Sequence, residues 1–153
     1  MKTTRYSHKS GDRVVPHDVA AKVEQSLADC NGLIRRNGAR TLRVQILERL
    51  HAAGWSNPVR LKVQVGLTIT AMHGRTGLCL QTGNMARFYA DLIKLQAQFV
   101  EGKISGAIYI LPTHSAATKL GSNIANFERF TAELGIFGGV ITVPILAIGF
   151  ESE

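Results

Sequence analysis

Cysteine is scarce in this sequence, because Cys30 and Cys79 are the only two among 153 residues. Two cysteines cannot build the disulfide framework of a small secreted domain, and with the scattered histidines they show none of the paired spacings of zinc ligands. Long apolar runs are also missing, since none reaches the roughly 18 residues that a membrane-spanning helix needs. The segment 1–13 lacks the apolar core of a secretory signal. We therefore expect a cytoplasmic protein without a membrane partner.

Acidic side chains are few, and one long central stretch has none. The chain has 11 Asp/Glu against 18 Lys/Arg, and no acidic residue lies between Glu48 and Asp91. The positive excess is confined to residues 1–75, which sum to +8, whereas residues 76–153 sum to −1. Such asymmetry favours a polyanionic partner such as a nucleic acid. The alternative is a basic solvated surface that binds nothing.

Domain linkers, repeats and nucleotide-binding glycine motifs are absent as well. The length suits one domain with a sizeable core. Residues 1–15 are polar and basic, and we expect them to form a flexible arm. The remaining residues, 16–153, are expected to form a single domain. Neither a phosphate-binding P-loop nor a dinucleotide-binding fingerprint occurs, so nucleotide binding has no motif to support it.

The stretch 67–96 shows the strongest pattern in the chain. Leu67 to Met72 alternates apolar and polar residues, His73-Gly74-Arg75 suits a tight turn, and Gly77 to Gln81 is a second short strand. A helical period follows from Asn84. This predicts a hairpin that leads into a long amphipathic helix. Paired in this way, the hairpin would put Leu67, Ile69, Leu78 and Leu80 on the core face. The opposite face would carry Thr68, Thr70, Cys79 and Gln81.

Further elements are expected on both sides of this stretch. Helices are predicted from Pro16 to about Ile34, over Thr41–Ala53 with Arg43 facing outward, and from Gly121-Ser122-Asn123 to Gly135. Strands are predicted over Arg60–Val65 and Ile104–Leu111, and a last one over Val140–Gly149, paired or bent at Pro144. The mixture of helices and strands predicts an α/β protein.

The segment LCLQTGN and the helix MARFYADLIKLQ resemble the second active-site strand and the following helix of BglII-type restriction endonucleases. The segments LPT and LGSNIANFERF are similar as well. These enzymes belong to the PD-(D/E)XK nuclease superfamily. The resemblance implies a mixed central β-sheet flanked by α-helices, binding of double-stranded DNA, and a homodimer.

The resemblance fails at the metal site. The family places an Asp near the end of one strand and Glu-x-Gln on the next; here Gln81 matches the Gln, Cys79 stands at the Glu position, and Thr70 falls near the Asp position. Hard divalent cations prefer carboxylate oxygens. The resemblance therefore implies a DNA-binding, catalytically inactive relative with no cofactor, such as a regulatory or accessory factor in defence or on a mobile element.

Two other functions stay open on the sequence alone. One is an active Mg²⁺-dependent endonuclease with a relocated metal site, for which Glu24, Glu48 and Asp91 are the candidate carboxylates. The other is a protein-interaction module that retains only the fold.

The candidate DNA-binding residues fall in several groups. Arg35, Arg36 and Arg40 lie on the connection between two helices, where they could clamp phosphates or only favour a helix carboxyl end. By resemblance, DNA would pass the side of the sheet where a strand ends near residue 112. Residues expected there or on the neighbouring segments are Lys62, Asn84, Arg87, His114, Ser115, Lys119 and Asn123. Capping of the last helix is the alternative role for Ser122 and Asn123.

Overall fold

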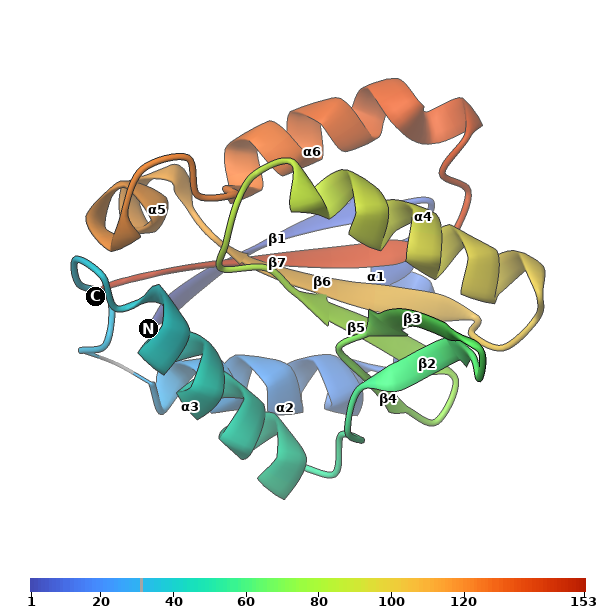
Figure 1. The fold of residues 1–153 in the computed structure, drawn as a ribbon, viewed down its shortest axis with the longest axis horizontal. Helices are drawn as coiled ribbons and strands as arrows, with labels where there is room; N and C mark the ends of the chain where they lie inside the picture. Colours follow the sequence, from blue (N-terminus) through green and yellow to red (C-terminus); the bar gives the residue numbers. More distant parts are fainter. Residues whose placement is uncertain (31) are drawn as a thin grey trace.

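The computed structural model describes residues 1–30 and 32–153, and its central feature is a five-stranded mixed sheet (Figure 1). The strands lie in the order β1-β7-β6-β5-β4. Their bounds are β1 Lys2–His8, β4 Ala71–His73, β5 Thr76–Leu80, β6 Gly106–Pro112 and β7 Ile145–Glu151. β5, β6 and β7 run parallel, while β1 and β4 pair antiparallel at the two edges. The predicted α/β class with a mixed sheet is thus confirmed.

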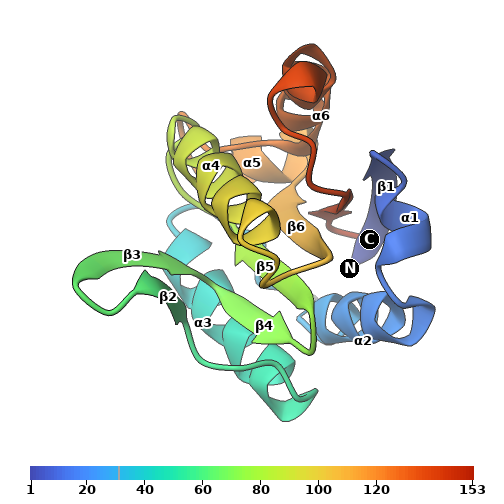
Figure 2. The ribbon, with the colours of Figure 1, turned by 90° about the vertical axis from the view of Figure 1, so that its right-hand side faces the viewer.

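Helices cover both faces of the sheet (Figures 1 and 2). One face packs against α2 and α3, and the other against α4 and α6. The helix bounds are α1 Gly11–Val14, α2 His17–Ala28, α3 Ala39–Ala52, α4 Arg87–Val100, α5 His114–Leu120 and α6 Phe127–Ile136, with a 3₁₀ turn at Phe137–Gly139.

The buried strands divide the core into two clusters, as expected for strands covered on both faces. Leu78, Ile108 and Ile148 point toward α2 and α3, whereas Cys79 and Tyr109 point toward α4 and α6. Every residue of β5 and β6 is buried. The three parallel strands are therefore a rigid base for whatever side chains follow their carboxyl ends.

The amino-terminal segment differs from the expected flexible arm. Lys2–His8 form the edge strand β1, which pairs with β7 from Lys2↔Glu151 to His8↔Ile145. The segment looked like a disordered arm because most of its side chains are exposed, which is also the pattern of an edge strand. Arg5 pairs with Glu24 of α2 at 2.5 Å and secures this edge.

The predicted hairpin is interrupted at Thr70. β2 (Val59–Lys62) and β3 (Val65–Ile69) form a separate two-stranded sheet, and the chain then continues as β4. Ile69 therefore packs on the α4 side while Leu78 and Leu80 pack on the α2–α3 side, and Leu67 is 52% exposed. The expected common face of these four residues is wrong, because alternation along the chain does not show where a strand changes sheet.

Three element boundaries also differ. The first predicted helix already ends at Ala28, so Ile34 lies outside it. α6 begins at Phe127, where the Asn126 side chain caps it by accepting from the Arg129 amide at 3.0 Å. Ser122 and Asn123 lie before this cap, in a loop where Asn123 has a positive φ of 54°. Segment 140–143 is not a strand, and β7 starts only after Pro144.

Candidate functional site

A pocket of about 360 Å³ lies beside the carboxyl end of β5. Its walls come from α3, the β2–β3 hairpin, the segment that follows β5, and the first half of α4. Gln81 enters the pocket because its backbone N–H still donates to the Ile110 carbonyl and so extends the β5–β6 pairing by one residue. Thr70 lines the pocket at the break between β3 and β4.

Asp91 of α4 is the centre of the polar contacts in this pocket. Its Oδ1 accepts from Lys94 Nζ at 2.7 Å, and its Oδ2 accepts from Gln81 Nε2 at 3.0 Å and from the Tyr109 hydroxyl at 2.8 Å. Asp91 is 8% exposed, so this carboxylate is satisfied by protein donors rather than by water. Lys94 also donates to the Thr68 carbonyl at 2.8 Å and thereby ties α4 to the hairpin.

A hydrogen bond fixes the Thr70 side chain, and burial in the core fixes Cys79. Thr70 Oγ1 accepts from the Leu80 amide at 3.1 Å, which takes the place of a ladder bond where the strand breaks. Cys79 is 1% exposed and lies behind the pocket wall. Burial, and then the charge of Asp91, raise the pKa of its thiol, so the thiol stays protonated at neutral pH. A neutral buried thiol is a poor nucleophile and a poor ligand for a hard cation.

Only one of the three carboxylates considered for a relocated site reaches the pocket. Asp91 lines it, whereas Glu24 binds Arg5 and Thr3 of β1. Glu48 is exposed on α3 and is not part of the pocket lining.

A second hollow also lies at the carboxyl ends of the parallel strands, where the segments that follow β5 and β6 meet. Asn84 forms an isolated bridge with Ile124, and His114 and Asn123 line this hollow. The connection between α2 and α3 adjoins it, because the Asn37 amide donates to the Leu120 carbonyl of α5. Arg35, Arg36 and Arg40 are exposed on or next to that connection, and Ser115 and Lys119 are exposed on α5.

Most of the candidate DNA-binding residues therefore gather around the carboxyl ends of the parallel strands (Figure 1). Arg87 lines the Asp91 pocket at the first turn of α4. Lys62 is the exception, since it is exposed on the β2–β3 hairpin, apart from α5.

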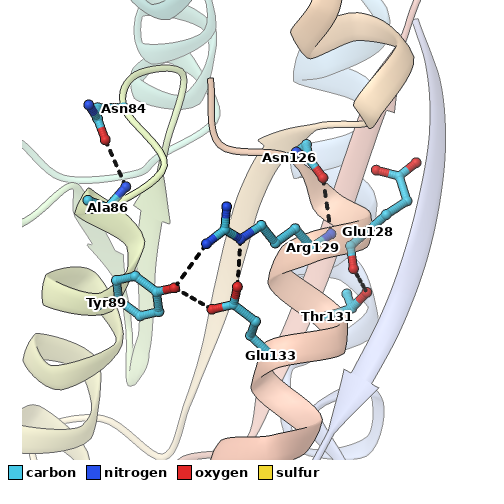
Figure 3. A network of polar contacts seen from close by, with 8 residues as sticks. All are labelled: Asn84, Ala86, Tyr89, Asn126, Glu128, Arg129, Thr131 and Glu133. Carbon is cyan, nitrogen blue, oxygen red and sulfur yellow. Dashed lines mark hydrogen bonds and ion pairs between the residues drawn. The ribbon is translucent and has the colours of Figure 1, made fainter. Parts of the chain in front are cut away.

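A polar network joins α4 to α6 (Figure 3). The Tyr89 hydroxyl donates to Glu133 Oε2 at 2.5 Å, and Arg129 Nε donates to Glu133 Oε1 at 2.6 Å. The hydrogen bond from Tyr89 is the largest cause that lowers the pKa of Glu133. The network thus ties the first turn of α4, through Tyr89, to Arg129 and Glu133 of α6.

Comparison with known families and solved structures identifies the family and the fold of this chain. A family model described as "Restriction endonuclease BglII/BglIII" matches residues 3–150. The chain belongs to this BglII family. No curated protein sequence matches it.

Solved structures share its fold at low sequence identity. The crystal structure of restriction endonuclease BglII complexed with a DNA 16-mer superposes with a TM-score of 0.88 at 16% identity, over 100% of this chain and 79% of that one. The crystal structure of free BglII gives a TM-score of 0.79 at 15% identity, over 100% of this chain and 81% of that one. The predicted restriction endonuclease-like core is thus confirmed. No helix among the described residues is long and apolar enough to cross a membrane.

The BglII family uses Mg²⁺, but the residues of the pocket do not fit this ion. Asp91 is the one carboxylate in the lining, and both of its oxygens accept from protein donors. The amide oxygen of Gln81 accepts from the Gly83 N–H at 3.0 Å. Among residues 1–30 and 32–153, no three His, Cys, Asp or Glu side chains lie together in a way that could hold a metal ion. Mg²⁺ requires several oxygen ligands, commonly with one or two free carboxylates.

Sequence reasoning missed two cations of the pocket. Arg43, expected to face outward, is half-buried and donates from Nη1 to the Leu80 carbonyl. Burial lowers the pKa of this guanidinium, although an arginine remains charged. Lys94 could have been found, because it follows Asp91 by three residues on a helix and such pairs are neighbours.

Proposed function

We propose that this chain is a catalytically inactive member of the BglII family that binds double-stranded DNA in the cytoplasm as a regulatory or accessory factor. One observation carries the proposal. The single carboxylate of the pocket, Asp91, is neutralised by Lys94 and held by Gln81 and Tyr109. Catalysis by a divalent cation needs carboxylates free to bind the ion, and this pocket offers none.

Two further observations support the DNA-binding part. The connection with the exposed Arg35, Arg36 and Arg40 is joined to the carboxyl end of α5 by the Asn37–Leu120 hydrogen bond, and these cations can contact phosphates. The BglII crystal structure that superposes with a TM-score of 0.88 is also a complex with a DNA 16-mer.

An active Mg²⁺-dependent endonuclease is the second candidate function, and one observation favours it. Asp91 lines the same pocket as Gln81, which is the residue that matches the family motif. In that case Asp91 would have to exchange Lys94 for a metal ion, and Mg²⁺ would be the cofactor. A module that only binds proteins is the third candidate.

One set of measurements separates the three candidates. We expect a fluorescent duplex to bind with a log K that falls as log salt rises, and to stay intact with Mg²⁺ or Mn²⁺. Metal-dependent cutting by the parent protein that Asp91→Asn abolishes, at a temperature where the variant is folded, would establish the active enzyme instead. Absence of any DNA binding at low salt would favour the protein-interaction module.

We also infer that the protein is a homodimer. An apolar hollow between α4 and the segment after α6 is lined by Tyr89, Leu92, Ile93, Phe137, Val140 and Ile141. Ile93 is 66% exposed and Val140 is 73% exposed. Contiguous exposed apolar surface of this kind marks an interface, and a twofold dimer uses the same patch on both copies.

A further inference from the structure

The Asp91 pocket has an unusual charge balance for a member of a family that uses Mg²⁺. Arg43, Arg87 and Lys94 line it, and Asp91 is the one acidic residue in the lining. The formal charge of the lining is therefore positive even after Asp91 is counted. A pocket built in this way attracts anions rather than a divalent cation.

The three cations keep hydrogen-bond donors available. Within the described part of the chain, the Arg87 side chain has no hydrogen bond or ion pair, and Arg43 uses its guanidinium only for the Leu80 carbonyl. Lys94 donates to Asp91 and Thr68, which leaves one of its three protons. Guanidinium groups bind phosphate oxygens through paired, charge-assisted hydrogen bonds.

The pocket can also admit a ligand. Pro58, Arg87 and Ala90 are exposed at its wall, whereas Asp91 and Gln81 are buried in it. Its volume of about 360 Å³ is many times the roughly 30 Å³ that one water occupies in the liquid. Arg43 is half-buried, so its charge is screened less by salt than that of an exposed arginine.

We propose that the pocket binds a phosphate group directly, without a metal ion, through Arg43, Arg87 and Lys94. Lys94 neutralises Asp91, so the carboxylate no longer repels the anion. The proposal rests on the proposed function for the source of the phosphate, which is the backbone of duplex DNA. Free inorganic phosphate has the same chemistry, and the test separates the two sources.

The first arm of the test uses inorganic phosphate with EDTA present. Backbone amide signals of Gly83 and Asp91 are followed by NMR during a titration with phosphate, and with chloride at matched ionic strength. We expect saturable shifts with phosphate alone. Arg87→Gln should weaken the affinity roughly tenfold, the loss expected for a charge-assisted hydrogen bond. Arg87 is exposed and unpaired in the described chain, so this variant should fold.

Arg13→Gln is the matched control, because Arg13 is exposed on α1 beside the amino ends of the parallel strands. It should leave phosphate affinity unchanged. A titration without saturation overturns the proposal. So does equal weakening of phosphate affinity by both variants.

The second arm uses a duplex in which single phosphates are replaced, one at a time, by neutral methylphosphonates. One position should weaken binding to the parent protein more than its neighbours, and Arg87→Gln should abolish that difference. Phosphate binding without any duplex binding would keep the pocket and overturn the DNA-binding function. Duplex binding without phosphate binding and without a sensitive position would overturn the phosphate pocket and keep the DNA-binding function.

Discussion

At the scale of single residues, Asp91 determines what its pocket can do. It accepts hydrogen bonds from three side chains that come from α4, β6 and the segment after β5. The three donors occupy both carboxylate oxygens, so a metal ion would have to displace Lys94 in order to bind. The same contacts thus link the stability of the site to its chemistry.

Asp91→Asn should destabilise the protein by roughly 2–4 kcal/mol, because an amide cannot accept from all three donors and Lys94 loses its counter-ion. Urea unfolding of both proteins measures the difference. Glu101→Gln is the control, since it removes the exposed partner of Lys103 from an ion pair of the same 2.7 Å length. That control should change stability little, and an equal effect of both substitutions would contradict the role of Asp91.

Stability should fall when the pH rises above about 8.5, the ordinary pKa of a thiol. Burial raises the pKa of Cys79 and the pKa of Tyr109, so the folded state keeps protons that the unfolded state loses. The contribution of Cys79 is complete below about pH 8.5 and that of Tyr109 below about pH 10, and above its own value each group removes up to about 1.4 kcal/mol per pH unit. Urea unfolding between pH 7 and 10 measures this. A weaker decline is expected for Cys79→Ala, and equal stability across the range would contradict the prediction.

The sequence located some residues of the pocket but not their contacts. Gln81 and Thr70 were placed near a common site by the family motif, and both line the pocket. The hydrogen bond from Tyr109 to Asp91 could not be predicted, because it joins β6 to α4 and depends on how the helix lies on the sheet. Arg43 was assigned to the solvent since a basic residue on a helix is usually exposed.

At the scale of elements, periodicity predicted the central strands and α4 but not the changes of partner. β5, β6 and α4 lie within a few residues of their expected positions. The break at Thr70 was missed, because an alternating run continues through it while the strand moves from one sheet to another. β1 was missed because an edge strand buries little and therefore has a polar sequence.

The connection between α2 and α3 should contribute to DNA binding as one unit. Changing Arg35, Arg36 and Arg40 to Ala should weaken binding to all duplexes alike, and should lower the slope of log K against log salt by about 0.9 for each phosphate that these arginines neutralise. Fluorescence anisotropy over a range of salt concentrations measures both quantities.

The matched control removes the same charge from the opposite end of the sheet. Arg13, Arg75 and Lys103 lie near the amino ends of β5 and β6, and none of them is in the proposed interface. Their triple change to Ala should leave most of the salt slope intact. Equal weakening by the two triple variants would mean that net charge, rather than a particular surface, attracts the DNA.

At the scale of the whole molecule, the homodimer predicts a dissociating variant. Ile93→Glu should convert the dimer to a monomer, because it places a charge in the apolar hollow. Ile93 is 66% exposed in one protomer, so the substitution should not disturb the fold of the monomer. Sedimentation velocity measures the mass, and an unchanged melting curve of the monomer shows that it is folded. Val63→Glu, at an 82% exposed valine of the hairpin connection, should remain dimeric. A parent protein that is monomeric at micromolar concentration would contradict the dimer.

The pairing of β1 with β7 has a consequence for synthesis on the ribosome. β1 leaves the exit tunnel before the other strands described here, yet its partner in the sheet, β7, is the last of them to be made. Tyr6 and the backbone of β1 therefore stay unpaired until the residues between β1 and β7 have been made. Such distant pairing slows folding and exposes unpaired strand edges to other nascent chains. A chaperone that binds extended segments could therefore bind β1 before β7 pairs with it.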